Sequence, residues 1–223
     1  MVYDFHTHTS LSDGTLSPME LIRRAIINNY QAIALTDHAS FGELGRIIPE
    51  VAEICALARS YWNILAIPGI ELTHLPPQAI SETAQRAREL GACMVVVHGE
   101  TIVEPVETGT NLAALRSPHV DILAHPGFLS LEEVQLAAAN GVFLEISARK
   151  GHCLTNGHIA SLAQQAGAKL LLNSDAHGHQ DLLTPSLVDA IAHGTGLDDI
   201  ACHQLLTINP QALIKSLPLN CQG

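Results

Sequence analysis

Histidine and carboxylate residues of this chain stand at the ends of short apolar runs, and the histidines are unusually numerous. The 223 residues include 13 histidines, a side chain that binds metals and titrates near neutral pH. His6 and His8 are one residue apart, so in an extended strand both imidazoles point the same way and can reach one ion. Asp175 and His177 repeat this spacing. The candidate metal ligands are His6, His8, Asp13, His38, Glu71, His98, His125, Asp175 and His177.

The types of these ligands favour particular metals. Imidazole and carboxylate groups without cysteine suit zinc, manganese or iron better than they suit an oxygen-only calcium or magnesium site. Nine ligands are too many for one ion. We therefore expect two to three divalent ions, with a carboxylate such as Glu71 bridging two of them.

The segments that carry these residues alternate between apolar strands and helices. Strands are predicted at residues 2–6, 32–36, 64–72, 92–97, 120–124, 142–146 and 169–173. Helices are predicted at residues 17–29, 44–60, 78–90, 111–116, 130–140, 156–166 and, with breaks, 185–217. The first helix is expected to begin with a capping box formed by Ser17 and Glu20.

This alternation defines the fold class. Strands that are each followed by a helix run parallel, with right-handed crossovers. We predict an α/β protein, a distorted TIM-like barrel of about seven strands, as a single domain that spans residues 1–223. Every candidate ligand then falls at the C-terminal end of a strand. In a parallel barrel those ends meet on the face that holds active sites, so ligands from the whole chain converge on one pocket.

The charge and the ends of the chain limit the partners. The formal net charge is −11, which is compatible with several bound cations but is also common in proteins that need it only for solubility. The absence of a basic stripe argues against nucleic-acid binding. No signal peptide and no apolar stretch of about 18 residues is present. We expect a soluble, cytoplasmic protein without a membrane partner, and the sequence leaves its oligomeric state open.

The cysteines are expected to be free. Their number is odd and no pair has CxxC spacing, which argues against a disulfide framework or a zinc ribbon. Cys93 lies in an apolar run and is predicted to be in the core, and the others are predicted to be reduced thiols. The full set is Cys55, Cys93, Cys153, Cys202 and Cys221.

In their order along the chain, the ligand motifs resemble the PHP family, the polymerase and histidinol phosphatase superfamily. The motifs are His6-Thr7-His8 with Ser12-Asp13-Gly14, Thr36-Asp37-His38, Gly69-Ile70-Glu71, Val97-His98, Ala124-His125-Pro126 and Ser174-Asp175-Ala176-His177. The resemblance covers nearly the whole chain and leaves no gap in the ligand set. It implies a distorted seven-stranded barrel with a trinuclear metal centre that hydrolyses phosphate esters.

The resemblance also implies how the ligands are shared. The first ion would be held by His6, His8, Glu71 and Asp175, the second by Glu71, His98 and His125, and the third by Asp13, His38 and His177. In the mechanism that we expect, a hydroxide that bridges the first two ions attacks phosphorus, and the third ion binds phosphate oxygens. No separate protein nucleophile is needed.

Other polar residues have weaker assignments. Arg149 or Lys150 could bind phosphate oxygens, although an exposed loop charge is an equal alternative. Asp37 is expected to support a ligand from behind or to cap its turn. His74, His152 and His158 are expected to be packed or solvated rather than to line the pocket. The loop at residues 107–111 could cradle a substrate or simply turn the chain.

The leading functional hypothesis is a phosphomonoesterase that acts on a small molecule. Histidinol phosphate, suggested by the resemblance alone, and a nucleotide are the candidate substrates. A nuclease or phosphodiesterase that acts on nucleic-acid ends is the nearest alternative. A non-hydrolytic, metal-binding regulatory barrel is another. An amidohydrolase-type enzyme is less consistent, because it predicts a longer, eight-stranded chain and commonly a carbamylated lysine.

Overall fold

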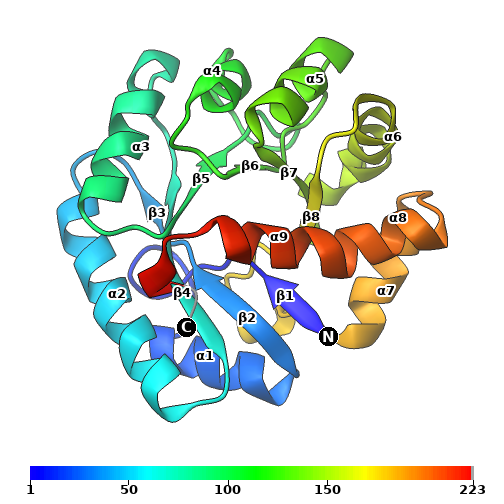
Figure 1. Cartoon of the computed structure of the whole chain (residues 1–223). Helices are drawn as coiled ribbons and strands as arrows, with labels where there is room; N and C mark the ends of the chain where they lie inside the picture. Colours follow the sequence, from blue (N-terminus) through cyan, green and yellow to red (C-terminus); the bar gives the residue numbers. More distant parts are fainter. Residues whose placement is uncertain (222–223) are drawn as a thin grey trace.

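A computed structural model describes residues 1–221, in which seven parallel strands form a nearly closed barrel (Figure 1). Within these residues the strand order is β1-β2-β4-β5-β6-β7-β8, and the two-residue strand β3 pairs with β4 beside this path. The predicted seven-stranded α/β barrel is therefore confirmed. Residues 222–223 of the predicted domain lie outside the described residues.

Strands and helices alternate along the chain as predicted. The strands are β1 (Val2–Asp4), β2 (Tyr30–Leu35), β3 (His38–Ala39), β4 (Leu65–Leu72), β5 (Met94–His98), β6 (Ile122–Ala124), β7 (Phe143–Ser147) and β8 (Leu170–Asn173). The helices are α1 (Pro18–Ile27), α2 (Leu44–Tyr61), α3 (Ile80–Glu89), α4 (Thr110–Arg116), α5 (Leu131–Asn140), α6 (Asn156–Ala166), α7 (Pro185–Gly194), α8 (Asp199–His203) and α9 (Asn209–Ser216). Short helical turns are η1 (Pro77–Ala79), η2 (His152–Thr155), η3 (His179–Asp181), η4 (Gln204–Ile208) and η5 (Leu219–Cys221). Within residues 1–221 no helix is both long and apolar enough to cross a membrane.

Most strand positions are apolar because both faces of the strands are buried. In β2, Ile33 and Leu35 pack into the layer between the sheet and the surrounding helices, whereas Ala32 and Ala34 point into the barrel. Strand β5 alternates in the same way between these two layers. This alternation is typical of parallel strands that are covered on both sides. Polar side chains are therefore concentrated near the C-terminal ends of the strands, and Glu145 in the middle of β7 is an exception.

The barrel closes between β1 and β8 without a full hydrogen-bond ladder. A single parallel bridge joins Thr7 and Ala176, just beyond the two strands. Nearby, the side-chain oxygen of Asn173 accepts a hydrogen bond of 2.9 Å from the backbone N–H of Phe5. A buried backbone donor needs a partner, and here a side chain supplies it. The distortion of the barrel is located at this seam.

The C-terminal segment closes the N-terminal end of the barrel. Helix α9 lies across this end in Figure 1, and Leu213 and Leu217 join the apolar cluster inside the barrel. Cys221 forms a disulfide with Cys93, with Cα atoms 6.1 Å apart, a separation typical of such bonds. The prediction that Cys221 is a reduced thiol is therefore wrong, whereas Cys93 lies in the core as predicted. The reason is that the fold returns the end of the chain to the start of β5, 128 residues earlier in sequence.

The capping box predicted at the first helix is also absent. The side chain of Ser17 makes no capping hydrogen bond. Glu20 instead binds Arg23 and Arg24, both at 2.7 Å, from one turn further along α1. The two guanidinium groups compete successfully for the carboxylate because charge-assisted hydrogen bonds are stronger than a bond to a neutral backbone N–H.

Candidate metal centre

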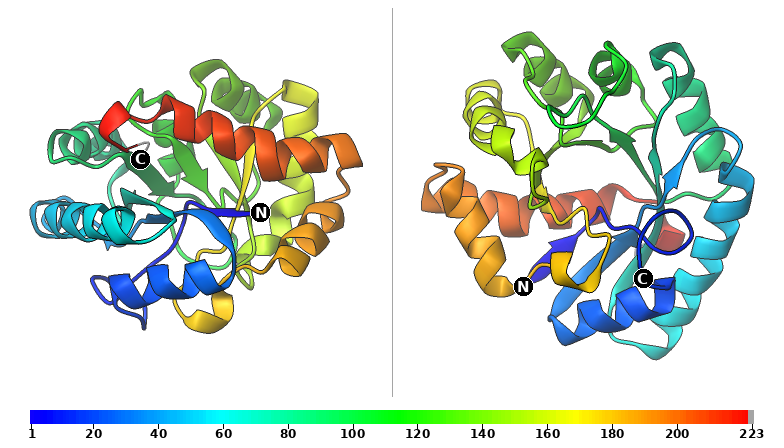
Figure 2. Two further views of the ribbon diagram at one scale, coloured as in Figure 1. Left: turned by 60° about the horizontal axis from the view of Figure 1, so that its bottom comes forward. Right: turned by 180° about the vertical axis from the view of Figure 1, so that it is seen from behind.

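The predicted ligands lie together at the C-terminal end of the barrel. Glu71 is the second-last residue of β4, His98 is the last of β5, and His125 directly follows β6. This end faces the viewer in the right-hand view of Figure 2, opposite α9. The strands are parallel, so a residue at the end of any one of them is brought to the same face.

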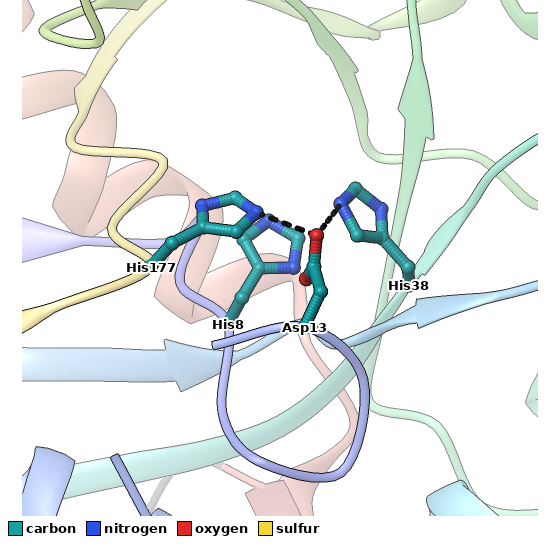
Figure 3. A group of neighbouring side chains, drawn as sticks. All are labelled: His8, Asp13, His38 and His177. Carbon is teal, nitrogen blue, oxygen red and sulfur yellow. Dashed lines mark ion pairs between the residues drawn. The ribbon is translucent and has the colours of Figure 1, made fainter. Parts of the chain in front are cut away.

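One group of four side chains consists of Asp13, from the loop after β1, and the three imidazoles around it (Figure 3). Its Oδ2 lies 3.3 Å from Nε2 of His177 and 3.7 Å from Nε2 of His38. The ring of His8 stacks between these imidazoles, at centroid distances of 4.1 Å from His38 and 4.2 Å from His177. The ligand atoms of all four residues lie within 4.8 Å of one another, close enough to hold one ion.

Glu71 lies at the middle of the cluster and is completely buried. Its Oε1 is 3.2 Å from Nε2 of His6 and 3.7 Å from Nε2 of His125. Its Oε2 is 2.6 Å from Nδ1 of His38 and 3.6 Å from Nε2 of His8. One carboxylate therefore contacts imidazoles assigned to all three expected ions.

Asp175 completes the deep part of the cluster. Its Oδ1 lies 3.2 Å from Nε2 of His8 and 3.7 Å from Nε2 of His6. The ligand atoms of these three residues form a second group, and His6, Glu71 and His125 form a third. A fourth group contains His125, Asp175 and a residue that the sequence did not indicate, His152.

Polar atoms without partners test whether ions fit these groups. In the described part of the chain, the buried side-chain nitrogen and oxygen atoms without a hydrogen bond belong to His6, His8, Glu71, His125 and Glu145. All five residues lie in or directly beside the cluster. An unpaired buried polar atom is destabilising by about 1–3 kcal/mol, so such a concentration is expected where another group supplies the bonds. Imidazole and carboxylate atoms in this arrangement fit divalent cations.

Glu145 and Asn173 fix the orientation of His6, with Glu145 contacting its Nδ1 and Asn173 contacting Glu145. The ring Nδ1 of His6 is 2.7 Å from Oε2 of Glu145, and the amide of Asn173 donates to the same carboxylate oxygen at 3.1 Å. An imidazole held at Nδ1 by a carboxylate presents Nε2 to a metal in a fixed orientation. Both residues were missed in the sequence, although each lies in a predicted strand, at a position where an apolar side chain would be ordinary.

Burial prepares two of the imidazoles as neutral ligands. Desolvation lowers the pKa of His8 and of His125 well below the ordinary histidine value. The positive charges of His38 beside His8, and of His98 beside His125, lower these pKa values further. A neutral imidazole is the form that binds a metal.

Two other deep residues, His6 and Asp175, have raised pKa values and hold protons more tightly. Burial opposes a charge on His6, but the carboxylates of Glu71, Glu145 and Asp175 outweigh it and raise the pKa of His6 well above its ordinary value. Burial raises the pKa of Asp175 to about 7. Without metal, therefore, the cluster carries protons near neutral pH that a cation must displace.

Asp37 positions the loop that carries Asp13. Its Oδ1 accepts hydrogen bonds from the backbone N–H of Thr9 (2.8 Å) and from the N–H (3.1 Å) and hydroxyl (2.7 Å) of Ser12. Its Oδ2 accepts from the Thr9 hydroxyl at 2.8 Å. Gly14 is required in the same loop because a Cβ there would collide with the backbone of His8. Asp37 thus acts through the loop and not on a ligand side chain directly.

Two ligand residues have unusual backbone conformations. His125 has φ of 26° and Asp175 has φ of 52°, values that are uncommon for residues with a Cβ. Such conformations concentrate at functional sites, where the surrounding structure maintains them. Both residues directly follow the strand that carries them, so the unusual turn aims each side chain into the cluster.

His98 lies at the edge of the cluster, beside an acidic residue of the next loop. Its ring centroid is 4.4 Å from that of His125, but its Nε2 lies 3.1 Å from Oε2 of Glu104. It belongs to none of the four ligand groups of the described residues. His152, expected to be packed or solvated, is instead buried in the cluster. A signal for His152 was available, because it lies in the loop that follows β7.

The two candidate phosphate-binding residues lie in different places. Arg149 is partly exposed and donates from Nη1 to the backbone oxygen of Asp175 at 3.0 Å. The same Nη1 is 2.8 Å from Nδ1 of His177, so the guanidinium lies directly beside the cluster. Lys150 is exposed and lines a neighbouring recess on the surface. The structure therefore brings Arg149 to the site and leaves Lys150 outside it.

Of the other residues whose roles the sequence left open, some line the site and others lie away from it. His74 is exposed but lines the cavity over the cluster, whereas His158 binds the backbone oxygen of Leu129 and packs on Phe128. The loop at residues 107–111 is held by Glu100, whose Oε1 accepts from two backbone N–H groups of that loop. The loop also lines a recess next to the cluster.

Two adjoining cavities open above the ligands. The first, of about 330 Å³, is lined by Asp13, His38, His177 and other members of the cluster together with Arg149. The second, of about 270 Å³, is mainly apolar. His74 and His98 line both cavities. The site therefore combines a polar, metal-binding floor with an apolar side recess.

Comparisons with known proteins agree with this geometry. The PHP domain description matches residues 4–184. An uncharacterised protein of Methanocaldococcus jannaschii is 44% identical over 218 residues, covering 97% of this chain and 100% of its own. A protein of Shewanella halifaxensis named "Probable phosphatase" is 30% identical and covers 96% of this chain and 91% of its own. The DNA polymerase/3'-5' exonuclease PolX of Bacillus subtilis is 27% identical, and the match covers 78% of this chain but 34% of PolX.

Solved structures share the fold at low sequence identity. A candidate histidinol phosphatase of Listeria monocytogenes superposes with a TM-score of 0.57 at 14% identity, covering 81% of this chain and 97% of that one. The ochratoxinase of A. niger gives a TM-score of 0.62 at 12% identity and covers 99% of this chain and 72% of its own. These likenesses show a shared barrel and nothing about the substrate.

Fold and site together define the class as a parallel α/β barrel whose C-terminal face carries clusters of His, Asp and Glu that could hold metal ions. The chain belongs to the PHP domain family, and with it to the metal-dependent phosphoesterases.

Proposed function

We propose that the protein hydrolyses a phosphate monoester of a small organic molecule. The nine predicted ligands would hold two to three ions of zinc, manganese or iron. The observation that carries this proposal is the position of Glu71, whose two oxygens contact imidazoles from each expected ion site. A bridging carboxylate is the group that keeps several cations within reach of one phosphoryl group.

The cavities favour a small substrate. Volumes of about 330 and 270 Å³ are at the lower end of the range for small-molecule sites. The net charge of −11 would repel a nucleic-acid backbone. Among the described residues that line the polar cavity, Arg149 is the only Lys or Arg. Its planar donors are suited to phosphate oxygens.

The protein groups have distinct roles in this proposal. Bound ions would acidify water and neutralise charge on the phosphoryl group. Arg149 would orient phosphate oxygens, and Asp37 would keep the loop of Asp13 in place. The apolar recess, lined by Leu75, Ile80 and Val106 among others, would receive the organic part of the ester. Histidinol phosphate and nucleotides remain candidate substrates because each joins one phosphate to a compact ring system.

The test compares a monoester with a diester. The metal-loaded protein should hydrolyse p-nitrophenyl phosphate, and the variant His8→Ala should not. Phenyl phosphate should be a better substrate than glycerol 2-phosphate because its ring fits the apolar recess. His193→Ala is the matched control, since His193 is exposed and lies on α7 outside the cluster. Hydrolysis of bis-p-nitrophenyl phosphate alone would contradict the proposal and favour a phosphodiesterase.

A further inference from the structure

Strand β7 is followed by a histidine that has the geometry of a metal ligand. His152 begins η2, five residues after β7 ends, and is only 4% exposed. Its ring stacks on that of His125 with centroids 4.1 Å apart. Its Nε2 lies 3.9 Å from Oδ2 of Asp175. One ligand atom from each of these three residues lies within 4.8 Å of the others.

The orientation of His152 is fixed in the same way as that of His6. The hydroxyl of Thr101 lies 2.6 Å from Nδ1 of His152, just as Glu145 holds Nδ1 of His6. With Nδ1 occupied by a partner outside the cluster, Nε2 faces inward. A histidine that binds a metal usually has its second ring nitrogen held by an oxygen in this manner, whereas a packed histidine has no need to aim its free nitrogen at other ligands.

Two loops hold this arrangement together. Thr101 and Glu104 belong to the loop after β5, and His152 belongs to the loop after β7. Gly151 has φ of 93°, and a Cβ at that position would lie 3.2 Å from the side chain of Val103. The absence of a side chain at Gly151 therefore lets the loop after β7 pack closely against the loop after β5. Glu104 also joins the two loops, because its Oε1 lies 3.5 Å from Nε2 of His152.

We infer that His152 is a tenth metal ligand. Together with His125 and Asp175 it forms a cation position on the β6–β7 side of the centre. Two imidazoles and one carboxylate match the protein ligands of a zinc-type site, and His152 and Asp175 line the polar cavity. The inference rests on the proposed metal centre and is independent of the substrate.

Metal content tests this role directly. The variant His152→Ala, dialysed against Zn²⁺ or Mn²⁺ and then against buffer, should retain about one ion fewer per chain than the wild type. Competition with a chelator should show at least a tenfold weaker affinity if the ion is still retained. The variant Thr101→Val should weaken affinity by about 10- to 100-fold, the usual effect of removing the partner of a metal-bound histidine.

The matched control is His158→Ala, which removes the same side chain six residues later, outside the four ligand groups. It should keep wild-type metal content. Unfolding curves of the metal-free proteins will show whether each variant is folded. Wild-type stoichiometry and affinity in a folded His152→Ala variant would overturn the inference, and a raised KM in that variant would identify His152 as a substrate contact. Wild-type protein that binds its ions but hydrolyses no phosphate ester would contradict the proposed function and leave this inference standing.

Discussion

The two ends of the barrel are made by the same strands but have opposite character. At the C-terminal end the strand ends and the loops that follow them carry His, Asp and Glu residues, and buried polar atoms there lack hydrogen bonds. At the N-terminal end the opening is filled by Leu213 and Leu217 of the C-terminal segment and crossed by the disulfide of Cys93 and Cys221. The first end keeps its polar groups unsatisfied, and the second is packed like an ordinary core.

This difference implies that one end of the barrel contributes mainly to the stability of the fold and the other mainly to its chemistry. Unsatisfied buried groups destabilise a protein unless a ligand binds them, so we expect the C-terminal end to depend on bound cations. Packed leucines and a cross-link stabilise the fold without any ligand. Changes at one end should therefore affect activity and metal content, and changes at the other should affect the free energy of unfolding.

The largest effect on activity is expected at Glu71, the carboxylate proposed to bridge the ions. Glu71→Gln should reduce phosphoesterase activity by about a thousandfold, equivalent to roughly 4 kcal/mol of transition-state stabilisation. The reason is that an amide cannot bridge cations as a carboxylate does. Steady-state kinetics and elemental analysis of the same sample would check this, with circular dichroism confirming the fold. A variant with normal metal content and more than a tenth of the wild-type rate would contradict a bridging role.

The disulfide should give the largest effect on stability. Cys221→Ser opens a cross-link between residues 128 apart, and the chain-entropy estimate for a loop of that length is about 5 kcal/mol. Denaturant unfolding without reductant should show the loss, and metal content should not change. Cys153→Ser is the control, since Cys153 is a free cysteine. Detection of two free thiols at positions 93 and 221 under oxidising conditions would refute the cross-link.

A smaller loss of stability is expected from the apolar closure. Leu213→Ala removes a buried side chain from the interior cluster and should lower the free energy of unfolding by about 3 kcal/mol. The activity of the folded variant should stay close to that of the wild type. Ile208→Ala, at a half-exposed position in the same segment, should change stability by less than about 0.5 kcal/mol. An equal loss in both variants would show that α9 does not close the barrel.

The smallest effect is the pH dependence of metal binding. Neighbouring carboxylates raise the pKa of His6, and burial raises that of Asp175 to about 7, so cations must displace protons near neutral pH. Apparent affinity should fall as pH falls from 8 to 6, by up to about tenfold per pH unit for each displaced proton. Chelator competition at pH 6, 7 and 8 measures this slope. His8 and His125, whose pKa values are lowered, should contribute nothing to it, and an affinity independent of pH would contradict the assignment.

Much of the architecture followed from local patterns. Apolar runs bounded by glycine and followed by amphipathic segments predicted the strands and helices because the strand and helix periods differ. Ligands at strand ends were predicted to converge because parallel strands place those ends on one face. The structure brings eight of the nine predicted ligands into the four groups, with His98 at their edge.

The roles of Glu145 and His152 were not visible in the sequence. Glu145 lies inside an otherwise apolar strand, and its role depends on the position of His6, 139 residues away. His152 has the same spacing from its strand as many solvated loop histidines. Only the packing of its loop against the loop of Thr101 and Val103 turns its ring into the cluster.

The sequence by itself determined the order of strands and helices, the kinds of ligand and the face on which they meet. These properties depend on chain periodicity and on strand direction, which are local. The tertiary structure decided which candidate ligands lie close enough to share an ion, which loop residues support them, and how the C-terminal segment and the disulfide between Cys93 and Cys221 close the barrel. Those contacts join residues far apart in the chain, and their geometry is set by packing that no short stretch of sequence contains.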